Sequence, residues 1–135
     1  MRSSRRSAAR QARWCLAVVI LLGGCSKNRE RSEAERVEMA LQRIGLATPA
    51  EREPLIAALE NERFESPRVE KVRVECAAAY RALHTVQIAL STVAADPVQA
   101  AEQLKLSKSA SEAAKASHER CQEARMAVRE ALGIK

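Results

Sequence analysis

The sequence predicts an all-α protein, a small helical bundle in which two short N-terminal helices precede a long antiparallel helical hairpin. Three observations lead to this prediction. Apolar residues recur at alternating steps of three and four over two long stretches, which is the spacing of one helix face. Alanine, leucine and valine alternate with charged residues, and aromatic residues make up only 2% of the chain, a composition that favours helices over a deep globular core. Proline and glycine separate the stretches, where the chain must turn.

The first predicted helix covers residues 32–45. Ser32 and Glu35 stand three residues apart, as in a capping box, and Gly45 supplies a stop signal. An apolar stripe follows at helical spacing: Val37, Leu41 and Ile44.

The second predicted helix covers residues 49–63. Thr48 and Glu51 repeat the capping signal, with Pro49 at the first helical position. We expect Pro54 to disturb this helix near its start, because proline has no N–H group to donate.

The hairpin is predicted from two helices, 67–95 and 97–132. Asp96-Pro97 ends the first helix and caps the second, because the residue before proline resists helical dihedral angles. The apolar face of the first helix contains Val69, Val72, Cys76, Ala79, Leu83, Val86, Leu90 and Val93. The matching face of the second contains Ala110, Ala114, Ser117, Cys121, Ala124, Val128 and Ala131. These small residues allow the two helices to approach closely.

Residues 1–24 have the pattern of a signal peptide. Five arginines precede an apolar run from Trp14 to Leu22, which is long enough for a signal-peptide core but too short to cross a bilayer as a helix. The run closes on Leu22-Gly23-Gly24-Cys25, which resembles the lipobox of bacterial lipoproteins that are processed by signal peptidase II.

This resemblance implies that Cys25 becomes the lipidated N-terminus, with a diacylglyceryl group on its thiol and a further acyl chain, typically palmitate, on its amine. It also implies membrane attachment in the cell envelope. Ser26 favours the outer membrane, facing the periplasm, because in sorted lipoproteins an aspartate at this position favours the inner membrane. Residues 25–31 are then expected to be a flexible tether, and residues 32–135 the helical domain.

The charge balance argues against a nucleic-acid partner. Five of the 23 basic residues lie in the first 24 residues, so 18 basic and 17 acidic side chains remain in the rest of the chain. The high overall isoelectric point therefore belongs to the segment that is predicted to be removed.

Cys76 and Cys121 are predicted to form a disulfide. Cys76 lies 21 residues before Pro97 and Cys121 lies 24 residues after it, so an antiparallel hairpin brings them to the same level. Both also occupy the apolar faces of their helices. In an oxidising envelope compartment such a pair favours a disulfide over a metal site.

Catalytic groups are scarce in the predicted helical domain. It contains one aspartate, Asp96, and two histidines, His84 and His118, and it has no phosphate-binding loop or nucleophile motif. We therefore predict no enzyme activity, no cofactor and no metal site, and we interpret both histidines as solvated surface residues. Charge pairs at helical spacing, such as Glu70 with Arg73 and Glu112 with Lys115, are interpreted as solvated faces.

Two functional interpretations stay open. The first is a lipid-anchored envelope protein whose disulfide-linked helical domain has a structural or protein-binding role, as a monomer rather than a helical homo-oligomer. The second is a small-ligand or metal-binding lipoprotein with a crevice between the first two helices and the hairpin, next to Val74 and Ile88. The layout, with its lipid signal and terminal Lys135, is also similar to that of the murein lipoprotein, whose last lysine is joined to peptidoglycan.

Overall fold

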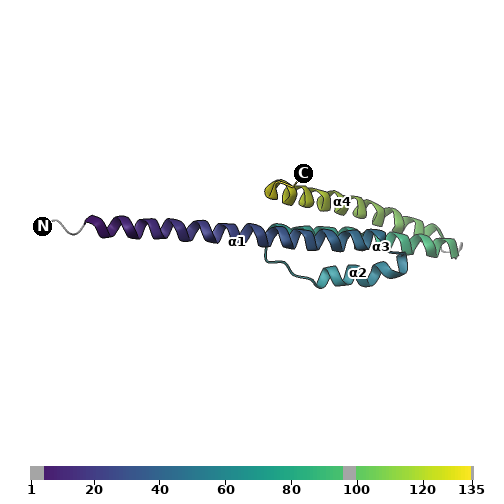
Figure 1. Ribbon diagram of the computed structural model, residues 1–135. Coiled ribbons are helices and arrows are strands. Elements are labelled where there is room, and N and C mark those ends of the chain that lie inside the picture. The colour runs from purple at the N-terminus through teal and green to yellow at the C-terminus, as the bar shows by residue number, and fades with distance from the viewer. Residues whose placement is uncertain (1–4, 96–99, 135) are drawn as a thin grey trace.

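The computed structural model describes residues 5–95 and 100–134, with side chains described for residues 26–92 and 100–134. These residues form four helices and no strand, which confirms the prediction of a small all-α bundle. The helices are α1 (Arg5–Leu46), α2 (Pro49–Asn61), α3 (Pro67–Ala95) and α4 (Ala100–Leu132). The hairpin of α3 and α4 lies along the second half of α1, α2 packs against α1 and α3, and the turn end of the hairpin extends beyond the end of α1 (Figure 1).

Helix α1 is much longer than predicted. It runs without a break over 42 residues, so the prediction of a flexible tether at 25–31 is wrong, and so is the helix start at Ser32. Lysine, arginine and glutamate are good helix formers, and nothing in this segment breaks a helix. Contacts with other helices also hold the last residues of this segment in place. Glu30 accepts a hydrogen bond from the Ser66 hydroxyl at 2.9 Å, and Arg31 donates to the Leu132 carbonyl at 3.2 Å.

The turn between α1 and α2 is close to the predicted one. The backbone N–H of Thr48 donates to the Glu51 carboxylate at 3.0 Å, as the capping box requires. Helix α2 continues through Pro54 without interruption and ends at Asn61, two residues before the predicted end. The predicted disturbance at Pro54 is therefore not observed.

The hydrophobic core lies in the part of the bundle where all four helices overlap. The largest fully buried side chains are Val37, Ile44, Ile56, Leu59, Val69, Val72 and Cys76. From α4, the buried side chains in this core are Cys121, Ala124 and Val128. These core residues of α3 and α4 are those that the apolar periodicity predicted, so the interface between α3 and α4 has the expected register in this region.

Toward the turn end of the hairpin, the α3–α4 interface is no longer covered by α1 and α2. Leu83 and Leu90 lie on the predicted apolar face of α3, yet they are 41% and 49% exposed. Val74 was also expected to be covered by the first two helices, and it is 47% exposed although it lies beside the buried Cys76 and not at the turn end. Ile88, which lies toward the turn and was expected to be covered in the same way, is 53% exposed. Helix α1 ends at Leu46 and α2 is short, so neither reaches along the whole hairpin.

The two ends of α4 also differ from the predicted pattern. Residues 96–99, which include the predicted cap at Asp96, lie outside the described residues, and the first described helical residue is Ala100. At the other end Ala131 is exposed, and Leu132 packs against the core instead. The helix stops at Gly133, whose φ of 65° is a conformation that favours glycine.

Candidate functional site

The two predicted disulfide residues lie together in the α3–α4 interface. The sulfur atoms of Cys76 and Cys121 are 2.03 Å apart and their Cα atoms 4.6 Å apart, across a sequence separation of 45 residues. Both residues are buried in the core. The disulfide therefore holds α3 against α4 within the buried part of the hairpin.

The predicted lipid site lies on α1. The helix passes through Cys25, whose side chain is outside the described side chains, and Lys135 lies outside the described residues altogether. Among the described residues, none of the helices contains a segment apolar and long enough to span a membrane.

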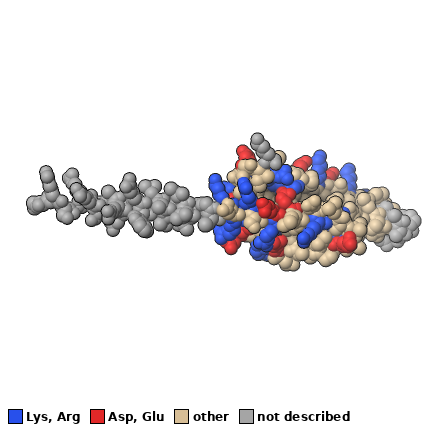
Figure 2. All heavy atoms as spheres, in the orientation of Figure 1, with Lys and Arg blue, Asp and Glu red and all other residues tan. Residues whose placement is uncertain are grey.

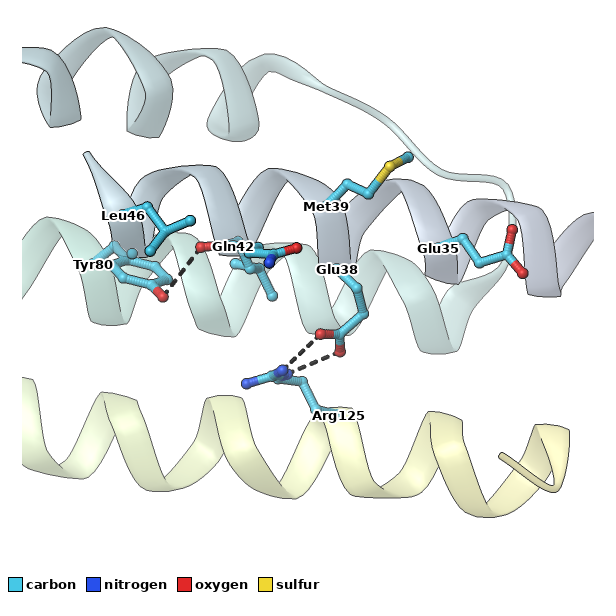
Figure 3. A pocket seen from close by; sticks show the side chains of 9 residues that line it. Glu35, Glu38, Met39, Gln42, Leu46, Tyr80 and Arg125 are labelled. Atoms are coloured by element: carbon cyan, nitrogen blue, oxygen red, sulfur yellow. Dashed lines mark hydrogen bonds and ion pairs between the residues drawn. The ribbon is translucent and has the colours of Figure 1, made fainter. Parts of the chain in front are cut away.

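One concave feature is a groove between α1 and α4, which we call the α1–α4 groove. It consists of two adjoining hollows that share Leu41, Tyr80 and Arg125. Helix α3 forms its floor, because α1 and α4 both pack on α3 and touch each other only briefly. Figure 3 shows the first hollow, with Tyr80 rising from α3 between the two walls.

An ion pair crosses this groove. The Arg125 guanidinium of α4 donates to both oxygens of Glu38 on α1, at 2.9 Å from Nε and 2.6 Å from Nη2 (Figure 3). The hydrogen bonds to Glu38 raise the pKa of Arg125. Nearby, the Tyr80 hydroxyl donates to the Leu41 carbonyl at 3.3 Å. Tyr80 thus packs between the helices, partly buried against the core, with its hydroxyl at the edge of the groove.

The second hollow has a volume of about 470 Å³ and lies on the turn side of Arg125, between Leu41 and α4. Leu83 contributes to its apolar surface, and Lys115 and His118 from α4 stand at its rim. His118 is exposed, as predicted.

His84, in contrast, is not a solvated surface residue. It is only 8% exposed, and its Nε2 lies 3.2 Å from the Glu53 carboxylate of α2. Its Nδ1 is buried without a hydrogen-bond partner in the part of the chain that the structure describes. This contact could not be predicted from the spacing of residues, because Glu53 is 31 positions away and belongs to another helix. Within the described side chains, no three residues of the types that bind metals gather in one place.

Arg73 also departs from its predicted solvated position, since it is only 8% exposed. It does pair with Glu70, at 2.6 Å, and the hydrogen bond between them lowers the pKa of Glu70 and raises that of Arg73. However, Arg73 also donates to the Glu60 carbonyl at 2.9 Å, at the end of α2. The spacing on one helix identified the pair, but not the contact with α2.

A second arginine joins α3 to α2. Arg81 donates to the carboxylates of Glu60 and Glu53. The hydrogen bond to Glu60, and to a smaller extent the one to Glu53, raises the pKa of Arg81. The hydrogen bond from Arg81 in turn lowers the pKa of Glu60. These contacts have a structural role: they fix α2 to the hairpin on the side away from the α1–α4 groove.

Sequence reasoning missed the α1–α4 groove, although one signal for it exists. Lys115, His118, Gln122 and Arg125 follow one another at steps of three and four beside the apolar face of α4. Such a polar row marks a helix edge, but it does not reveal that α1 and α4 stand apart.

No protein-family model matches the chain, and no curated protein and no solved structure matches it either.

Proposed function

We propose that this chain is a bacterial outer-membrane lipoprotein facing the periplasm, whose disulfide-linked helical domain has a structural or protein-binding role. The observation that carries the proposal is the sequence Leu22-Gly23-Gly24-Cys25 at the end of a short apolar run behind five arginines. Two or more acyl chains anchor a protein stably, because each buried methylene contributes about 0.8 kcal/mol.

The pair of cysteines supports an oxidising compartment. A disulfide between Cys76 and Cys121 persists outside the cytosol, where thiols are not kept reduced. Because the two cysteines belong to one chain and to one hairpin, the pair also supports a monomer.

A protein-binding role is supported by the exposed half of the hairpin. Leu90 and Ile88 on α3 and Leu104 and Leu106 on α4 are each about half exposed. Large aliphatic side chains gathered at one end of a molecule are typical of an interaction surface.

Lipidation is tested by labelling cells that express the full chain with an alkyne analogue of palmitate. We expect label on the wild type and on Cys15→Ser, and no label on Cys25→Ser. Cys15 is a matched control because it lies near the same apolar run without a lipobox before it. Globomycin, which inhibits signal peptidase II, should leave a heavier precursor. Equal labelling of the two serine variants, or an unchanged mass with the drug, would remove the proposal.

Sorting is tested separately by the variant Ser26→Asp. Wild-type protein should sediment with outer-membrane fractions, and the variant should move to the inner membrane. If both forms stay in the inner membrane, the assigned location is wrong although lipidation stands.

A further inference from the structure

The second hollow of the α1–α4 groove has a rim of one charge sign. Its lining contains Lys115, His118 and Arg125 and no carboxylate, whereas Glu35 and Glu38 line only the first hollow. The chain as a whole mixes basic and acidic residues, so this separation is local.

Two of these basic groups have no partner among the described residues. The predicted pair of Glu112 with Lys115 is not formed there, and neither Lys115 nor His118 has an ion pair or a side-chain hydrogen bond within residues 26–92 and 100–134. Arg125, by comparison, is already bound to Glu38. The rim therefore offers an ammonium and an imidazole to an incoming acceptor.

The surface below this rim is apolar. Leu41, Leu83 and Ala114 line it together with Tyr80, and Leu83 remains 41% exposed although it lies on the apolar face of α3. Small residues on the α4 wall, such as Ala114, leave the space open. A volume of about 470 Å³ lies in the lower part of the range that is usual for small-ligand sites.

We propose that the second hollow binds a long-chain fatty acid, with the acyl chain against Leu41, Leu83 and Ala114 and the carboxylate at Lys115 and His118. The apolar lining buries the acyl chain of the ligand, and the basic residues at the rim favour an anionic head group. The small volume favours one acyl chain over the two of a phospholipid. This inference does not depend on lipidation of Cys25.

The test uses the purified full-length chain in a nonionic detergent and a palmitic acid that carries a diazirine and an alkyne. After illumination, mass spectrometry locates the adducts. We expect light-dependent adducts on the peptides around Leu83 and Ala114. Unlabelled palmitate should compete about tenfold better than hexadecanol, which has the same chain without the charge. Equal competition by the alcohol, or no light-dependent adduct in these peptides, would overturn the proposal.

A matched pair of variants separates this site from general attraction. Lys115→Glu should lower the labelling about tenfold, whereas Lys108→Glu, the same substitution one heptad earlier on an exposed position outside the hollow, should leave it unchanged. Ala114→Phe fills the hollow without changing its charge and should also lower the labelling. Circular dichroism and an intact disulfide confirm that each variant is folded. Wild-type labelling of both Lys115→Glu and Ala114→Phe would exclude this hollow as the binding site.

Discussion

At the scale of single residues, charged side chains hold the helix ends together. Glu33 of α1 is buried and accepts hydrogen bonds from the N–H groups of Glu65 and Ser66, just before α3 begins. Arg52 donates to the Ile44 and Ala47 carbonyls where α1 ends. These contacts satisfy backbone groups that helix termini leave without intrahelical partners.

Arg73 has the same role at the end of α2. Replacing it with methionine should lower the free energy of unfolding by about 2 kcal/mol, because the Glu60 carbonyl and the Glu70 carboxylate lose a buried charged donor. Urea denaturation at neutral pH measures the change.

Lys71→Met is the control, since it removes one positive charge from an exposed position on the same helix turn. It should change stability by less than about 0.5 kcal/mol. If both variants lose the same stability, the contact of Arg73 with α2 contributes nothing.

Sequence reasoning at this scale succeeded where the partners are close in the chain. Thr48 with Glu51 and Glu70 with Arg73 are three positions apart, and both pairs are present. It failed for the burial of Arg73 and His84, because that burial depends on α2 packing across α3. The spacing of residues on one helix contains no information about such a contact.

At the scale of helices, the apolar periodicity predicted the hairpin and the level at which its cysteines meet. The error lay at the start of α1. Ser32 and Glu35 have capping-box spacing, but the residues before Ser32 form a helix equally well, so the signal marks no boundary. A capping pattern indicates a helix start only where the preceding residues resist helical structure.

The disulfide should contribute much of the stability of this hairpin. The cross-link closes a loop of 45 residues and so lowers the entropy of the unfolded chain. Its removal should lower the free energy of unfolding by about 4 kcal/mol, or by less where structure persists in the unfolded chain. The double variant Cys76→Ser, Cys121→Ser should therefore melt at a clearly lower temperature than the wild type.

Reducing agent provides the control for this prediction. It should lower the melting temperature of the wild type toward that of the double variant and leave the double variant unchanged. A wild type that melts at the same temperature with and without reductant would contradict a stabilising disulfide.

At the scale of the whole molecule, packing is uneven. Buried residues concentrate where the four helices overlap, and the sequence between Arg81 and Glu102 contains one formal charge, Asp96. On the face shown in Figure 2, charged side chains are dense over the overlapping region and fewer toward the turn end. The periodicity predicted the fold class, but not this division, because it does not show where α1 ends relative to the hairpin.

Amide hydrogen exchange should reveal the same division. Amides in residues 72–79 and 117–128 should exchange slowest, because these segments contain core residues and the disulfide. Amides in residues 86–92 and 104–112 should exchange about tenfold faster or more, since few buried contacts oppose local opening there. Mass spectrometry of peptides after timed labelling measures the rates. Uniform protection along the hairpin would show that the turn end is as stable as the core.

The hydrogen bond from Arg31 to the Leu132 carbonyl has a practical consequence for protein engineering. It places the end of α4 beside the start of the bundle, on the side from which the N-terminal half of α1 projects (Figure 1). An affinity tag or fluorescent reporter fused behind α4 would therefore lie close to the N-terminal half of α1 and to any surface to which that half is attached. The same fusion inserted between Ala95 and Ala100 would stand at the opposite end of the molecule.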